Sequence, residues 1–264
     1  MQRQDYSEEI IAKLIYNYQT LKMPLSKAGL EYGIKRSVVT RILKERGIHI
    51  RNQSENSRKY KLDESFFSKE NEIMAYVLGF IAADGSISKD SNRIKIGLST
   101  NDKEQLEMLK MLMHMDYPIK DYVSQDNYQI SELTWTCEQH KKDLAKYGVV
   151  PKKTYNFRFP VNLNKKYWPD FIRGYFDGDG CITGIKPEWK ICSYKREILD
   201  FINNYFEEFG ISKVNIYKRK NQELYDIRYQ SKESLIKIYK ILYYNPNIPC
   251  LKRKKIKFES YKMI

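Results

Sequence analysis

The sequence contains nearly the same seven residues twice, "GFIAADG" at 79–85 and "GYFDGDG" at 174–180. Both copies end in Asp-Gly, and both their first and their last glycines are 95 residues apart. Around each copy the predicted elements follow one order: a helix, a hairpin, a helix, a second hairpin and a closing helix. Self-similarity at a fixed offset indicates an internal duplication. We therefore expect an α+β domain of two pseudo-twofold related αββαββα repeats, covering residues 68–165 and 166–264, each with an antiparallel sheet.

Small residues recur four positions apart in each copy. They are Gly79 and Ala83 in the first copy and Gly174 and Gly178 in the second. Residues four apart share one face of a helix, and a strip without large side chains lets another helix backbone come close. We expect the two helices to pair through these four residues across the pseudo-twofold axis. The first helix is predicted over 68–84, with Ser68 as its N-cap.

The Asp-Gly endings place two carboxylates at the C-terminal ends of these helices, because glycine readily ends a helix. Asp84 and Asp179 then face the negative end of the helix dipole and, if the helices pair, each other. A divalent cation would convert this unfavourable arrangement into a binding site, since carboxylates, carbonyls and water suit Mg²⁺. We predict a Mg²⁺ site, in which Mn²⁺ can substitute, formed by Asp84, Asp179 and the backbone of Ala83 and Gly178. The alternative is that each Asp is an ordinary turn residue.

The longer segments "VLGFIAADG" (77–85) and "IRGYFDGDG" (172–180) resemble the two signature motifs of the LAGLIDADG homing endonucleases. The resemblance covers about residues 70–264. It implies a monomer that mimics a dimer and cuts both strands of a long, nearly asymmetric DNA target, with Asp84 and Asp179 as catalytic, metal-binding acids. An earlier acidic position of the motif is Ala82 in the first copy and Asp177 in the second, which leaves the metal-binding positions intact.

The same resemblance implies one basic residue per repeat beside the site. "GVVPKKTYNFRFP" (148–160) and "LKRKKIKF" (251–258) resemble the family segments that carry it and indicate Lys153 and Lys254 as further catalytic residues. These lysines could stabilise transition-state charge or tune the attacking water. The basic neighbours Lys152, Arg253 and Lys255 leave the register open. A simple contact to phosphate or solvent is an equally good interpretation of each lysine.

The charge balance supports a nucleic-acid partner. The net charge is +14, with 13 Lys and Arg against 6 Asp and Glu in residues 1–62, and 6 basic residues against 1 acidic in the last 14. Such a balance makes a polyanion the default partner, although a nonspecific basic surface is the simpler alternative. We predict binding to double-stranded DNA, with no obligate protein partner and no membrane.

Residues 7–50 are predicted to form a small helical unit. A short helix over 25–32, ended by Gly33, and a second helix from Lys35 fit a helix-turn-helix. On this interpretation the groove-facing side of the second helix carries Arg36, Ser37, Thr40 and Arg41. An ordinary helical hairpin with a basic surface is the alternative. We assign residues 1–50 to this domain and the polar stretch 51–67 to a linker.

Alternation along the predicted strands marks the sheet faces that could lie along the major groove, which accepts a two-stranded ribbon. Polar side chains alternate there with buried apolar ones such as Ile94, Ile96 and Ile227. The candidate DNA contacts on these faces are Arg93, Lys95, Lys190, Asn215, Tyr217, Arg219, Arg228 and Gln230. Any one of them could equally be a solvated surface residue.

Several classes of protein are disfavoured. The longest apolar stretches are far shorter than the ~20 residues of a membrane span, and no export signal is visible at the N-terminus. The four cysteines have no CxxC spacing, which argues against a structural zinc site. We expect a protein of the cytoplasm or nucleoid.

Together these features predict a Mg²⁺-dependent, site-specific endodeoxyribonuclease that hydrolyses one phosphodiester per strand and leaves a staggered double-strand break. Two alternatives use the same scaffold. One is a DNA-binding transcription regulator that does not cut, and the other is an RNA-binding maturase.

Overall fold

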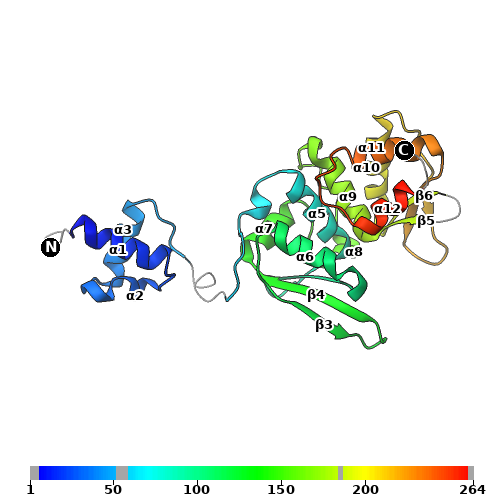
Figure 1. Cartoon of the computed structure of the whole chain (residues 1–264). Helices are drawn as coiled ribbons and strands as arrows, with labels where there is room; N and C mark the ends of the chain where they lie inside the picture. Colours follow the sequence, from blue (N-terminus) through cyan, green and yellow to red (C-terminus); the bar gives the residue numbers. More distant parts are fainter. Residues whose placement is uncertain (1–5, 52–58, 184–186, 261–264) are drawn as a thin grey trace. The chain divides into compact units, whose positions relative to one another are not determined.

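The computed structural model describes residues 6–51, 59–183 and 187–260. The chain forms two compact units, Met1–Tyr60 and Lys61–Ile264, which are coloured along the sequence in Figure 1. Part of the predicted linker, residues 52–58, lies outside the described residues. No described helix is long and apolar enough to cross a membrane.

The N-terminal unit is a small helical bundle. Its elements are α1 (Glu8–Gln19), α2 (Leu25–Ala28), the 3₁₀ turn η1 (Leu30–Tyr32) and α3 (Arg36–Glu45). Leu14, Val39 and Leu43 are fully buried at its centre. Gly33 ends η1 with φ of 65°, a left-handed conformation that glycine adopts without strain. The predicted helix over 25–32 is therefore a single α-turn followed by a 3₁₀ turn, and the second helix begins at the predicted place.

The second unit contains the two repeats. The first consists of η2 (Phe66–Ser68), α5 (Glu72–Asp84), β1 (Gly85–Ile87), β2 (Arg93–Ser99), η3 (Thr100–Asp102), α6 (Lys103–Leu112), β3 (Ile119–Val123), β4 (Gln129–Thr136), α7 (Glu138–Lys146) and α8 (Lys153–Asn156). The second consists of η4 (Lys165–Tyr167), α9 (Trp168–Asp179), β5 (Gly180–Thr183), β6 (Glu188–Ser193), α10 (Arg196–Glu207), β7 (Tyr217–Lys218), β8 (Tyr225–Tyr229), α11 (Lys232–Leu242) and α12 (Lys252–Glu259).

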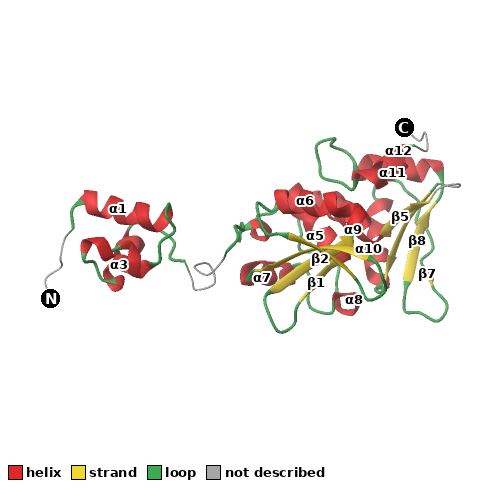
Figure 2. Cartoon of the chain, turned by 60° about the horizontal axis from the view of Figure 1, so that its bottom comes forward, coloured by secondary structure: helices red, strands yellow, loops and turns green. Residues whose placement is uncertain are grey.

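The two sheets have the same topology. Their strand orders are β1-β2-β4-β3 and β5-β6-β8-β7, and every neighbouring pair is antiparallel. Figure 2 shows the strands in two groups, with α5 and α9 in the central region of the unit. The predicted duplicated α+β fold is thereby confirmed.

Alternation divides each sheet into a buried and an exposed face. In β2, Ile94 and Ile96 are fully buried while Arg93 and Lys95 are exposed. In β6, Trp189 and Ile191 are fully buried. Because successive strand residues point to opposite faces, the buried faces pack on the helices and contribute to one apolar core that runs through both repeats. The polar faces remain open to a partner.

Two sequence expectations about boundaries were wrong, and two helices were missed. The first motif helix begins at Glu72, not at Ser68, because Asn71 is its N-cap and accepts a hydrogen bond from the Met74 N–H. Phe67 is fully buried in the core of the second unit, so the connecting segment ends before residue 67. The two helices that carry the candidate lysines, α8 and α12, were not predicted as helices.

Candidate functional site

The site is built on the direct contact between α5 and α9. A Cβ atom added at Gly79 would collide with the carbonyl oxygen of Phe171, and one at Gly174 would collide with that of Tyr76. Because neither glycine has a side chain, the backbones of the two helices come into direct contact. Near the C-terminal ends, a Cβ at Gly178 would collide with the Ala83 methyl group and lie 3.0 Å from Asp84 Oδ2. The small-residue strips therefore bring the two Asp-Gly ends together.

The carboxylates of Asp84 and Asp179 lie at these two ends. Asp84 is half-buried and Asp179 is exposed. Loss of hydration raises the pKa of Asp84 to about 6, with repulsion from Asp179 as the next cause. Asp179 is exposed as a whole residue, but its carboxyl group loses part of its hydration, which raises its pKa against the attraction of Lys153 and Lys254. Neighbouring carboxyl groups with raised pKa values are typical of functional sites.

Each carboxylate lines a surface cavity. A cavity of about 710 Å³ extends from Asp84 over the exposed face of the first sheet to Tyr122 and Gln129. A smaller cavity of about 340 Å³ contains Asp179, Lys153 and Arg219. Both acids can therefore be reached by a substrate that covers the sheet faces.

Two lysine ammonium groups complete the site. Lys254 Nζ donates to the carbonyl oxygens of Phe176, Asp177 and Gly178 at 2.8, 2.7 and 3.2 Å, so it satisfies the last turn of α9. Lys153 Nζ does the same for α5, through the carbonyls of Ala82 and Ala83. Burial lowers the pKa of Lys153 and lowers that of Lys254 to about 8.

This arrangement distinguishes the two lysines from their basic neighbours. Lys152 is exposed, with a left-handed φ of 56°. Arg253 turns away and forms a two-point ion pair with Asp102, with both distances 2.8 Å. Lys255 approaches Glu259. Lys153 and Lys254 are the members of these basic runs whose ammonium groups reach the motif helix ends.

The oxygens at the helix ends fit a hard divalent cation. In the described part of the chain, no group of three or more His, Cys, Asp or Glu side chains is placed to hold a metal. The candidate ligands are the carboxylates of Asp84 and Asp179 and the carbonyls of Ala83 and Gly178. Each of these carbonyls also accepts from a lysine ammonium group and would bind a metal through its second lone pair. Oxygen ligands completed by water or phosphate are typical of Mg²⁺ sites, and the repulsion between the two acids provides the electrostatic reason for a cation there.

A buried polar network supports the second half of the site. Asp177 Oδ2 accepts hydrogen bonds from the Leu251 N–H at 2.6 Å and from the Tyr76 hydroxyl at 2.9 Å. Leu251 precedes α12, the helix that carries Lys254. Tyr76 comes from α5, so the network joins the two repeats. The role of Asp177 could not be predicted from the sequence, because its partners lie 74 and 101 positions away.

The predicted DNA contacts on the first sheet lie on its outer face. Arg93 is exposed, and Lys95 pairs with Glu132 across β2 and β4 at 3.1 Å. On the second sheet, three of the predicted contacts, Lys190, Arg219 and Arg228, surround the Asp226 carboxylate. Another, Gln230, donates to Glu188 at 2.6 Å.

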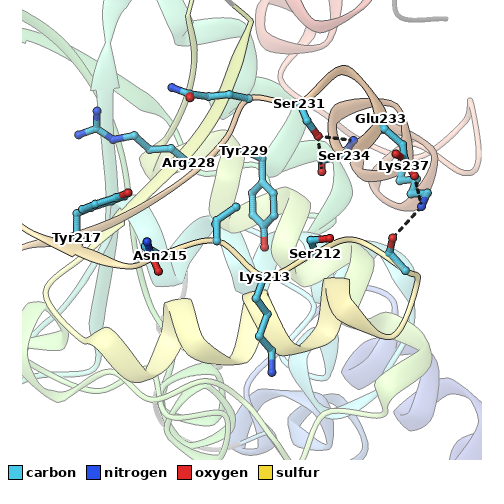
Figure 3. A pocket seen from close by; sticks show the side chains of 13 residues that line it. Ser212, Lys213, Asn215, Tyr217, Arg228, Tyr229, Ser231, Glu233, Ser234 and Lys237 are labelled. Atoms are coloured by element: carbon cyan, nitrogen blue, oxygen red, sulfur yellow. Dashed lines mark hydrogen bonds and ion pairs between the residues drawn. The ribbon is translucent and has the colours of Figure 1, made fainter.

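Asn215 and Tyr217 belong to an open pocket of about 850 Å³ beside β8. Figure 3 shows Tyr217 and Arg228 at one end of this pocket and Ser231, Ser234 and Lys237 at the other. Lys237 is held there by Glu233 and by the Gly210 carbonyl, at 2.8 and 2.7 Å. The pocket thus extends the polar face of the sheet. Two of its cations, Lys237 and Arg228, already pair with acids of this chain.

In the N-terminal unit, α3 carries the four predicted groove-facing residues. Arg36 and Ser37 are exposed, whereas Thr40 and Arg41 are half-buried. The Thr40 hydroxyl donates to the Arg36 carbonyl at 2.9 Å, and Arg41 lies 3.9 Å from Glu45. Arg36 and Ser37 are therefore the better placed of the four to contact a partner.

Asp226 is a second residue of the site region that was not predicted from the sequence. This acid is fully buried although it lies in β8 on the same side of the sheet as Arg228. A signal was present, because an Asp two residues before an Arg in a strand places both on one face. The two other cations that reach Asp226 come from β6 and from the residue that follows β7, and the alternation along β8 could not reveal them.

Comparison with known proteins gives a consistent result. The sequence profile of a family described as the LAGLIDADG-like domain matches residues 71–134 and 170–243. An uncharacterised protein of Methanocaldococcus jannaschii is 26% identical over 205 residues, which cover 69% of this chain and 71% of that protein. The profile matches both repeats: the first match ends in β4, and the second extends through α11.

The similar solved structures include two of different kinds. Mesophilic variants of the homing endonuclease I-DmoI superpose with a TM-score of 0.51 at 14% identity, over 72% of this chain and 97% of that one. The full-length DUF199/WhiA protein of Thermatoga maritima gives a TM-score of 0.49 at 15% identity, over 76% of this chain. This chain spans 65% of the WhiA chain, slightly less than two thirds.

Proposed function

This chain belongs to the LAGLIDADG-like family, and we propose that it is a site-specific DNA endonuclease that makes a staggered double-strand break. The observation that carries this proposal is the pair of acids, Asp84 and Asp179, at the ends of the two packed motif helices, with one lysine beside each helix end. A protein that only binds DNA has no need for two neighbouring carboxylates, which repel both each other and phosphate.

Asp84 and Asp179, with the carbonyls of Ala83 and Gly178, would hold Mg²⁺, and Mn²⁺ can take its place. The metal supplies Lewis acidity and an activated water for phosphodiester hydrolysis. Lys153 and Lys254 hold positive charge beside the helix ends, where charge develops on the attacked phosphate. Because the two halves of one chain provide two half-sites, a monomer can hydrolyse one phosphodiester in each strand.

Double-stranded DNA would lie along the outer faces of both sheets. Arg93 and Lys95 belong to the first face and Lys190, Arg219 and Arg228 to the second. The net charge of +14 favours a polyanion, and phosphate contacts supply most of the affinity of such proteins. The N-terminal unit adds a second, tethered DNA-binding module, in which α3 enters the groove, and tethering raises its effective concentration at the target.

The test is cleavage of a host-genomic or randomised DNA library by the full chain. We expect a double-strand break at one long site in Mg²⁺ or Mn²⁺. The variants Asp84→Asn and Asp179→Asn should each lose at least roughly 10³-fold in rate, because a metal-bearing acid is lost. Asp200→Asn is the matched control, since it removes an exposed helix carboxylate with a weak Arg196 ion pair.

DNA binding by the same proteins, measured in Ca²⁺, separates the alternatives. Retained specific binding by both variants would show that they are folded and that the acids act in cleavage. Specific binding by the wild type without any cut in Mg²⁺ would contradict the endonuclease and favour a transcription regulator, which the N-terminal helical unit makes the second candidate. Preferential binding of structured RNA, independent of Mg²⁺, would favour the maturase.

A further inference from the structure

A fully buried acid lies in the middle of the otherwise open face of the second sheet. Asp226 has 0% exposure, and its strand neighbours are Cys192 of β6 and Tyr217 of β7. Sheet faces that await a partner rarely bury a carboxylate, since a charge removed from water must be compensated. The compensation here comes from three cations that surround it.

The three cations come from different parts of the sheet. Arg228, two residues further along β8, donates from Nε and Nη2 at 3.1 and 2.9 Å. Lys190 of β6 lies 3.3 Å away, and Arg219, just after β7, lies 3.6 Å away. Burial opposes ionisation, but the Arg228 and Lys190 contacts hold the pKa of Asp226 below its usual value. One negative charge thus gathers three positive ones, and the cluster keeps a net charge of +2.

The contact with Asp226 also determines which N–H groups of Arg228 remain available to a partner. Its Nε and one Nη2 hydrogen point at Asp226, so Nη1 and the second Nη2 hydrogen form a parallel pair of donors on the adjoining edge. The Arg228 side chain is 41% exposed and that of Arg219 is 42% exposed. A rigid, outward pair of donors matches the O6 and N7 acceptors of guanine in the major groove.

The first sheet provides an internal comparison. Lys95 and Lys190 are 95 positions apart and equivalent, and Glu132 occupies the place that Asp226 has in the second sheet. Among the described residues, Lys95 is the only cation paired with Glu132, which otherwise accepts from the hydroxyls of Thr134 and Tyr122. The duplicated fold therefore does not require a cationic cluster at this position. The cluster is a property of the second repeat.

We infer that Asp226 is a positioning residue that holds Arg228, Arg219 and Lys190 as a guanine-reading cluster. The half of the DNA target that lies under the second repeat then contains guanines that this cluster selects. The inference rests on the proposed function, because it needs duplex DNA on the outer sheet faces. It names what the second half-site recognises, and it assigns no comparable cluster to the first half-site.

The experiment is selection of bound duplexes from a randomised pool by the full chain in Ca²⁺, followed by sequencing. The wild type should enrich guanine at one to three positions in one half of the site. Asp226→Asn should reduce that preference by roughly 10- to 100-fold and leave the other positions unchanged. Arg228→Gln should shift one of these positions from guanine to adenine, because the Gln amide matches adenine. Glu132→Gln is the matched control and should preserve the guanine positions.

Two outcomes would overturn the inference. One is a wild-type site without guanine preference in either half. The other is a uniform loss of affinity in Asp226→Asn with all base preferences intact, which would show a structural role alone. Thermal unfolding of each variant identifies any that fail to fold, and Arg228→Gln then still tests the reading of guanine.

The cleavage assay keeps this inference distinct from the proposed function. Guanine selection without cleavage in Mg²⁺ would support the cluster and contradict the endonuclease. Cleavage at one site that lacks guanine preference would contradict the cluster alone, and failure to bind any duplex would contradict both.

Discussion

The two motif helices share a packing strip but differ in what their other sides bury. All ten buried residues of α5 are apolar, tyrosine or glycine. Helix α9 instead buries Asp170, Arg173 and Asp177, with exposures of 0%, 0% and 2%. The shared strip places the two carboxylates, and the polar residues of α9 add hydrogen bonds to the segment that leads into Lys254.

The first repeat anchors its lysine segment with apolar side chains. Val149 is fully buried and Phe157 is nearly so, and they flank the single turn of α8 that begins at Lys153. The second repeat uses hydrogen bonds. Arg173 donates to the carbonyls of Leu242 and Pro249 at 2.8 and 2.9 Å, and Asp177 accepts from the Leu251 N–H. A duplicated fold can therefore reach one functional geometry with two kinds of packing.

The variant Arg173→Met gives the strongest test of polar anchoring in the second repeat. The Arg173 guanidinium is fully buried and pairs with Asp170 at 2.8 Å. Its loss leaves two carbonyls without this donor and leaves the buried Asp170 carboxylate without its cation, with the Tyr244 hydroxyl still donating to it. We expect a loss of about 3–5 kcal/mol in the free energy of unfolding, the usual cost of breaking a buried ion pair from one side. Urea denaturation measures it.

The matched control is Leu78→Met, at the equivalent position of α5. Leu78 is fully buried among apolar groups, and Leu-to-Met exchanges usually cost under about 1.5 kcal/mol. Equal losses for the two variants would contradict the view that the second repeat depends on polar anchoring.

The second prediction concerns the lysines. Lys153→Met and Lys254→Met each remove a cation beside the attacked phosphate, and loss of one electrostatic stabiliser typically slows a reaction by roughly 10²–10³-fold. If each lysine serves one half-site, as the contact of each with one helix end suggests, each variant slows one strand and accumulates nicked plasmid. End-labelled duplexes should show opposite strands affected.

The control for the lysine variants is Lys255→Met, which changes the neighbouring basic residue of α12. It should cut both strands at the wild-type rate, because Lys255 faces Glu259 and not the helix ends. If Lys153→Met and Lys254→Met slow the same strand, or both strands equally, the assignment of one lysine to each half-site is wrong.

Local patterns in the sequence were sufficient to predict the shared features of the repeats. The 95-residue offset, the alternation in the strands and the paired Asp-Gly ends predicted the duplicated sheets and the two acids. The anchors were not predictable in this way, because they join distant positions, such as Asp177 with Leu251 and Arg253 with Asp102. The Ser68 cap failed for a local reason: Asn71 is also a good N-cap, and the Phe66–Phe67 pair is needed in the core ahead of the helix.

The smallest expected effect tests what the two repeats have in common. In most helices Gly→Ala stabilises by about 0.8–1 kcal/mol, through helix propensity. At Gly79 and Gly174 the added methyl group would meet the partner backbone, so the sign should reverse, with a net loss of about 1–3 kcal/mol from overpacking. Gly97→Ala, where the nearest atom is 3.7 Å away, is the control and should change stability by under about 0.5 kcal/mol.

Because each glycine faces the other helix, Gly79→Ala and Gly174→Ala should cost similar amounts despite the different interiors of their repeats. The double variant should cost less than the sum of the two, since helices already separated by one methyl group have room for part of the second. Stabilisation by either single variant, seen as a higher urea midpoint, would show that α5 and α9 do not rest on each other's backbones. The two carboxylates would then lack the close helix contact that brings them together.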